Sequence, residues 1–192
     1  MEAGHADGGG LIDPVEPIDL TGVPHERVLL ICEALAGCGT VVLHGSNVRP
    51  ALQLLEPRQA NDRAKPSGNL CAVYASLDAR VALLHALLDR RYLSARLGSW
   101  RIGYRHEAGQ LRFCASDNLY RLFCQRDPRL LSDGVIYGLA RCHFVRAAES
   151  ETEFHALSAQ RPVHILKVAA ALGHMLFCTD GHAGSASVVR YP

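Results

Sequence analysis

Residues 70–91, LCAVYASLDARVALLHALLDRR, predict a buried strand followed directly by a helix. The first seven of these residues form a short apolar run of the kind found in buried strands. Ser76 can cap the helix that follows, in which Val81, Leu84 and Leu88 line one face. A strand that passes straight into a helix predicts a domain in which both kinds of element pack on one core.

The segment before this unit predicts a helix, a strand and a long connection. Beginning at His25, HERVLLICEALAGCG has apolar residues at helical spacing and ends in glycines, as an amphipathic helix does. Thr40 to Leu43 then predict a strand that runs into His44. Residues 47–70 contain three prolines and no period, which predicts a long connection with one turn of helix at most.

Most of the expected strands lie in the second half of the chain. The alternating residues around Gly103 and Gly109 predict a hairpin, and the next apolar segment predicts a short helix that Pro128 ends. Residues 169–178 fit either a helix or a strand. Three further strand candidates are residues 134–145, 152–159 and 162–168. The fold class expected from this pattern is α+β.

Composition predicts one compact domain. The chain has 192 residues, of which 48% are hydrophobic and 20% charged, so residues 21–192 can bury a single core. Residues 1–20, with four glycines and two prolines, predict a flexible tail. A net charge of +1 gives no global attraction to nucleic acid or to an anionic membrane, so such binding would need a local patch.

The targeting and cysteine patterns predict a protein that is cytoplasmic as synthesised. There is no long uninterrupted apolar stretch and no signal-like N-terminus, which leaves open delivery into a host or target cell by a route that needs no such signal. The seven cysteines form no CxxC pair and mostly lie within apolar runs, which favours a reducing compartment. The ten histidines and the cysteines lack the short paired spacings of zinc sites, so no metal is expected.

The sequence lacks the familiar motifs of serine hydrolases and of common nucleotide-binding proteins. The sequence has no GxSxG elbow for a serine hydrolase and no GxGxxG or Walker loop for phosphate binding. A cysteine nucleophile with a distant histidine stays open, although no particular pair stands out. Nucleotide binding would therefore need another design.

Three short motifs suggest such a design. LHGS at residues 43–46 ends a strand, VYAS at residues 73–76 leads into a helix, and a glutamate precedes the aromatic of EFHALS at residues 153–158. In this order, and with His44 and Tyr74 thirty residues apart, the motifs resemble the H-Y-E group of ADP-ribosyltransferases, which includes the poly(ADP-ribose) polymerases and diphtheria toxin. The resemblance covers about residues 40–168 and implies a split, mixed and antiparallel β-sheet core with flanking helices.

The resemblance also implies that NAD is the substrate and assigns roles to individual residues. His44 would hydrogen-bond the adenosine-side ribose, and Ser46 would belong to the same NAD-binding segment. The backbone of Gly45, which carries no side chain, would approach the nicotinamide carboxamide. Tyr74 would lay its ring against the nicotinamide. Three nearby arginines could bind the pyrophosphate: Arg49, Arg58 and Arg63.

The third member of the group has to be a carboxylate. Breaking the nicotinamide–ribose bond builds positive charge on the sugar, which a nearby negative group stabilises. Glu149, Glu151 and Glu153 would share one side of a strand that began early enough. The resemblance favours Glu153 as the catalytic residue, because it stands directly before an aromatic residue, and Glu151 is the second choice.

Several alternatives remain beside this interpretation. ESETE contains the ExE pattern of the arginine-modifying R-S-E group, but no STS-like run precedes it. The helix after Tyr74 offers Ala82, His85 and Ala86 where polymerase-type transferases have a second aromatic. The expected activity is mono-ADP-ribosyl transfer, toxin- or effector-like, to a macromolecular acceptor, with a protein favoured, nucleic acid open and no membrane partner. The alternatives are an NAD glycohydrolase toxin and a non-catalytic module that binds through arginines and aromatics of residues 90–105.

Overall fold

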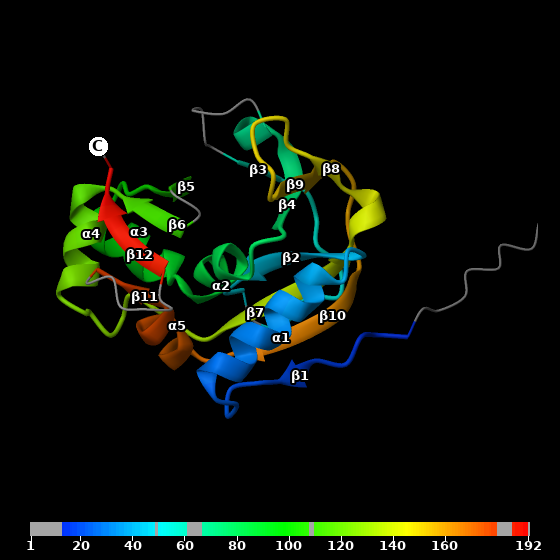
Figure 1. Cartoon of the computed structure of the whole chain (residues 1–192), viewed down its shortest axis with the longest axis horizontal. Coiled ribbons are helices and arrows are strands. Elements are labelled where there is room, and N and C mark those ends of the chain that lie inside the picture. Colours follow the sequence, from blue (N-terminus) through cyan, green and yellow to red (C-terminus); the bar gives the residue numbers. More distant parts are fainter. Residues whose placement is uncertain (1–12, 49, 61–66, 108–109, 180–185, 192) are drawn as a thin grey trace, which may run out of the picture.

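The computed structural model describes residues 13–48, 50–60, 67–107, 110–179 and 186–191. Two sheets stand side by side, with helices packed against each (Figure 1). The α+β prediction is therefore confirmed. The large sheet has the order β1 (Ile18–Asp19), β10 (Pro162–Val168), β7 (Gly134–Ala140), β2 (Val41–Ser46), β4 (Cys71–Ser76), β9 (Glu153–Ala156) and β8 (Val145–Arg146), and β3 (Arg58–Gln59) also pairs with β4.

The second sheet is smaller. Its order is β11 (Phe177–Cys178), β12 (Ala186–Arg190), β6 (Gln110–Ala115) and β5 (Ile102–Glu107). The helices in chain order are α1 (His25–Gly37), α2 (Ala79–Leu87), α3 (Arg90–Leu97), α4 (Asp117–Cys124) and α5 (Ala170–Leu176). Figure 1 shows α1 lying across the large sheet, whereas α3, α4 and α5 gather around the small one.

The large sheet is split between β2 and β4. Strand β2 pairs with β7 along its whole length, from Val41 to Ser46. On its other side it pairs with β4 at a single position, Leu43 with Ser76. Beyond that pair the two strands separate, so the segment His44 to Ser46 lies along the edge of the opening. The sheet is mixed, because β1 pairs with β10 in parallel and its other pairs are antiparallel.

Two apolar clusters hold the elements in place. The larger cluster includes Leu43, Ile136 and Leu166 from the sheet together with the buried residues of α1 and α2. The smaller includes Tyr137 and Ile165, together with Phe154. Since inward and outward residues alternate along a strand, β2 contributes to both clusters, and its position is set by both faces of the sheet.

The helix expected over residues 77–91 is two helices. Leu88 adopts an extended conformation and forms an isolated bridge with Leu131, which ends α2. Asp89 then begins α3 by accepting a hydrogen bond from the Tyr92 backbone N–H at 2.8 Å. The cap of α2 is also different from the expected Ser76, because Asp78 accepts from the Arg80 N–H at 2.9 Å. Asp78 directly precedes the first residue of α2, so its carboxylate reaches the free backbone N–H groups there, whereas Ser76 lies two residues earlier.

Several other elements begin or end at residues different from those predicted. Strand β2 continues to Ser46 rather than ending at Leu43, because β7 offers it a pairing partner over that whole length. The strand candidate at residues 134–145 is interrupted by a 3₁₀ turn at Arg141–His143. Residues 169–178 form α5 and then the short strand β11. Of the expected tail, residues 1–12 lie outside the described residues, whereas Ile18–Asp19 pair with β10.

Candidate functional site

The three residues of the H-Y-E resemblance lie on three neighbouring strands. His44 is on β2, Tyr74 on the adjacent β4, and Glu153 on β9, which follows β4 in the sheet. In the β4–β9 register Ser76 lies opposite Glu153 and Tyr74 opposite His155. The His44 ring spans the split, with its Nδ1 2.6 Å from the carbonyl oxygen of Tyr74. Residues thirty positions apart in sequence are therefore in direct contact.

The His44 hydrogen bond determines how its ring can act. A carbonyl oxygen only accepts, so Nδ1 carries the hydrogen and donates it to Tyr74. Burial has the largest effect and lowers the pKa of His44. The Tyr74 hydrogen bond, the next largest effect, opposes it, and the positive charges of Arg90 and Arg58 lower the pKa by smaller amounts. The ring is then neutral, with an acceptor lone pair at Nε2. Such a nitrogen accepts a hydrogen bond from a hydroxyl group.

Tyr74 is held at its hydroxyl end. The hydroxyl donates to the carbonyl oxygen of Leu70 and accepts from the N–H of the same residue, both at 3.0 Å. The side chain is half-buried. Because the phenol is anchored to the start of its own strand, the ring has a defined position at the split.

Packing against α2 requires glycine at position 45. A Cβ built there would lie 1.8 Å from the backbone oxygen of Ala82 and 2.7 Å from the backbone nitrogen of Ala86, both in α2. Gly134, at the start of the adjacent strand β7, faces Ala86 in the same way, with the nearest atom at 2.0 Å. The missing side chain therefore lets α2 press against the sheet. The approach of the Gly45 backbone to nicotinamide stays a prediction.

The other expected NAD contacts are only partly described. The Ser46 hydroxyl accepts from the Val48 N–H at 3.2 Å, which shapes the turn after β2. Arg49 and Arg63 lie outside the described residues. Arg58, on β3, is close enough to His44 to affect its pKa, so one of the three expected arginines lies near the split.

Only one of the three candidate glutamates belongs to the sheet. Strand β9 begins at Glu153, which is half-buried, whereas Glu149 and Glu151 precede it and are exposed. The strand starts too late for all three to share a side. The N–H of Glu153 donates to the Ser150 hydroxyl at 3.1 Å, which fixes the start of the strand. Glu153 therefore stands at the first position of β9, whereas Glu151 lies in the bend before it.

Tyr104, on β5 of the small sheet, lies close to Glu153. Burial raises the pKa of its phenol, and the negative charge of Glu153 raises it further. The side chain of Tyr104 also packs edge-on against Phe113, at a centroid distance of 6.4 Å. The small sheet thus covers the side of Glu153, and the local sequence gave no signal for this contact.

Sequence reasoning did not assign His85 and Arg90 to the site. His85 is on α2, and its Nδ1 lies 2.9 Å from an Arg90 guanidinium nitrogen. Burial lowers the pKa of His85 to about 3, and the charges of Arg90 and His44 contribute, so His85 is neutral and close to His44. Arg90 also lies over the Trp100 ring at 6.0 Å. The spacing of Ala82, His85 and Ala86 on one helix face was the available signal.

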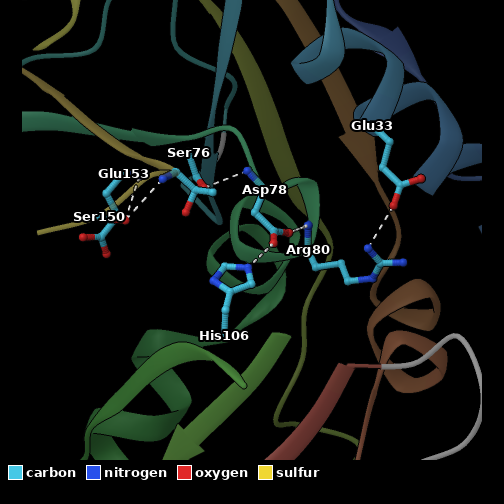
Figure 2. A network of polar contacts seen from close by, with 8 residues as sticks. Glu33, Ser76, Asp78, Arg80, His106, Ser150 and Glu153 are labelled. Carbon is cyan, nitrogen blue, oxygen red and sulfur yellow. Dashed lines mark hydrogen bonds and ion pairs between the residues drawn. The ribbon is translucent and has the colours of Figure 1, made fainter. Parts of the chain in front are cut away.

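A polar network joins the start of α2 to both sheets (Figure 2). Asp78 Oδ2 lies 3.4 Å from His106 of β5, and the Asp78 N–H donates to the Ser76 hydroxyl at 2.9 Å. Arg80 pairs with Glu33 of α1 at 2.9 Å. A depression of about 500 Å³ is lined there by residues that include Asp78, Arg80 and Thr152, the residue before Glu153. A surface with both charge signs therefore borders Thr152, the residue before Glu153 in the chain.

Comparison with known proteins identifies no relative. No protein-family model, no curated protein and no solved structure matches the chain. Within the described part of the chain, no group of three or more His, Cys, Asp or Glu side chains could hold a metal ion. No helix in that part is long and apolar enough to cross a membrane.

Proposed function

We propose that this protein is an NAD-dependent mono-ADP-ribosyltransferase, which transfers ADP-ribose from NAD to a macromolecular acceptor and releases nicotinamide. The observation that carries the proposal is the contact across the split, where the His44 ring meets the Tyr74 carbonyl oxygen at 2.6 Å. Glu153 stands on the next strand, two residue pairs along the register from Tyr74. The order of these three residues across the sheet is the order of the motifs along the chain.

The charges near His44 suit a dinucleotide. Its neutral ring leaves Nε2 to accept a hydrogen bond from a ribose hydroxyl. The positive charges of Arg58 and Arg90 act on the same ring, and guanidinium groups recognise phosphate oxygens well. Tyr74 offers a ring whose hydroxyl end is already held, so less side-chain entropy is lost when a flat group stacks on it.

The proposed reaction breaks the bond between the ribose C1 and the nicotinamide nitrogen. The electron pair of that bond leaves with nicotinamide, which becomes neutral, and positive charge develops on the ribose. The carboxylate of Glu153 stabilises that charge. An acceptor nucleophile then bonds to C1 and loses its proton to solvent or to a nearby base. The depression lined in part by Thr152, the residue before Glu153, is the surface where we expect the acceptor to dock.

The test is nicotinamide release from NAD by the purified protein. Glu153→Gln keeps the size of the side chain and removes its charge, so we expect a loss of about 100-fold or more. Glu151→Gln, at an exposed position outside the strand, is the matched control and should stay within about twofold of wild type. The proposal is wrong if wild type neither turns over NAD nor is stabilised by it.

The same assay separates transfer from hydrolysis. If release requires added cell lysate, and labelled ADP-ribose becomes attached to a macromolecule, the protein is a transferase. If release is equally fast in buffer and ADP-ribose stays free, water is the acceptor and the protein is an NAD glycohydrolase. A loss in Glu151→Gln in place of Glu153→Gln would instead assign the carboxylate to the loop.

A further inference from the structure

The charge of this nearly neutral protein is divided between its two sheets. Residues 89–132 and 170–191, here named the small lobe, contain the small sheet with α3, α4 and α5. They carry ten arginines, no lysine and five acidic residues, whereas the rest of the chain has ten basic and fourteen acidic residues. One lobe is therefore basic and the other acidic, which the overall net charge of +1 conceals.

Two arginine–tyrosine stacks concentrate this charge at one end of the small sheet. The Arg101 guanidinium lies 5.4 Å from the centre of the Tyr191 ring, and that of Arg190 lies 5.0 Å from the centre of the Tyr120 ring. Arg101 and Tyr191 are exposed, and the Arg190 side chain is 59% exposed. Arg121 is exposed on the same helix as Tyr120. These five residues are named the Arg/Tyr patch.

Backbone contacts bring the two stacks together. Arg101 and Ser116 exchange hydrogen bonds, with the Arg101 N–H donating to the Ser116 hydroxyl at 3.1 Å and the Ser116 N–H donating to the Arg101 carbonyl at 3.0 Å. The Tyr191 N–H donates to the Ala115 carbonyl at 2.9 Å. The Tyr191 hydroxyl also lies over Gly103, where a Cβ would come within 2.3 Å of it. The patch is therefore built on regular structure.

In the described part of the chain, acidic residues leave most of the positive charge of this patch unpaired. Asp117 lies 3.8 Å from Arg190 as an exposed ion pair, the kind of contact that contributes little. Among the described residues, this ion pair joins an acidic side chain to Arg190, and no such pair is formed by Arg101 or Arg121. Guanidinium groups match phosphate oxygens, and stacked arginine and tyrosine planes offer flat faces to bases. Bases in a duplex are already stacked on each other, so an unpaired strand suits these faces better.

We propose that the Arg/Tyr patch binds single-stranded nucleic acid, with its arginines on the phosphates and its tyrosines against the bases. The surface lies on the small lobe, and binding there needs neither NAD nor Glu153. The inference therefore stands apart from the proposed transferase activity. If the protein both transfers ADP-ribose and binds nucleic acid, the bound strand lies on the lobe whose Tyr104 is close to Glu153.

The experiment is fluorescence anisotropy with a labelled single-stranded RNA or DNA of about 12 nucleotides, measured without NAD on the full chain. We expect binding that weakens as salt rises from about 50 to about 200 mM. The double variant Arg101→Glu/Arg190→Glu should lose at least about tenfold in affinity, and the slope of log affinity against log salt should fall by about 1.4, for two lost phosphate contacts. Tyr191→Ala should lose at least about fivefold with little change in that slope.

The matched control is Arg146→Glu/Arg161→Glu, which makes the same change in net charge at exposed positions of the acidic lobe. Circular dichroism and thermal melting check that each variant is folded. The proposal is overturned if the control loses as much affinity as the patch variant, if a duplex of the same sequence binds as tightly, or if poly-glutamate competes as well as the oligonucleotide. No binding at low salt overturns it as well.

Discussion

Gly45→Ala tests whether this position serves the fold or only a ligand. The change adds one methyl group on the face of β2 that meets α2. That methyl would lie 1.8 Å from the Ala82 backbone oxygen, 2.7 Å from the Ala86 backbone nitrogen and 2.9 Å from the Ala82 carbonyl carbon. Since all three are backbone atoms of one helix, no side-chain rotation relieves the contact. The helix has to move by more than an ångström.

The size of the effect follows from what that movement disrupts. Overpacking a close-packed core by one methyl group costs about 1–3 kcal/mol, and more where the backbone has to shift. Helix α2 carries Leu83, Leu84 and Leu87, all nearly inaccessible to solvent, so displacing it loosens the larger apolar cluster. We expect Gly45→Ala to lower the free energy of unfolding by at least about 3 kcal/mol.

Urea denaturation followed by circular dichroism measures this change. Gly37→Ala is the matched control, because Gly37 is in α1 and a Cβ there would meet nothing within 4 Å. That variant should be neutral or stabilised by up to about 1 kcal/mol. If Gly45→Ala is as stable as wild type and loses only NAD binding, then the glycine serves ligand access and the packing argument is refuted.

Three further outcomes follow from individual contacts. Because the pKa of His85 is about 3 in the folded protein against a usual 6.5, only the unfolded chain gains its proton below pH 6.5, so stability should fall there by up to about 1.4 kcal/mol per pH unit. His85→Gln should flatten this slope in urea titrations across the range. Asp78→Ala removes the cap that accepts the Arg80 N–H and should cost about 1 kcal/mol, which Asp78→Ser should largely restore. Tyr137→Phe leaves the Leu52 N–H without its partner and should cost about 1–3 kcal/mol in the same assay; a neutral result would contradict that role.

Local patterns in the sequence were enough to predict the individual elements. The apolar run before Ser76 and the helical spacing after it predicted β4 and α2, because burial of one face depends mainly on residue type and period. The break at Leu88 was not predicted, since the apolar pattern continues across it. Its cause is the bridge to Leu131, a residue far along the chain.

In the candidate site too, short sequence motifs predicted some features, whereas contacts between distant parts of the chain were not predicted. The sequence by itself determined the residue types, their order and the preference for Glu153, which needed only short motifs and strand-start chemistry. It could not determine that Gly45 faces α2, that His85 lies near His44, or that Tyr104 reaches Glu153. These contacts join elements far apart in the chain, and they exist because both sheets and α2 must bury their apolar faces together. Only that packing decided which side chains share the split, and which of them lose their charge by burial.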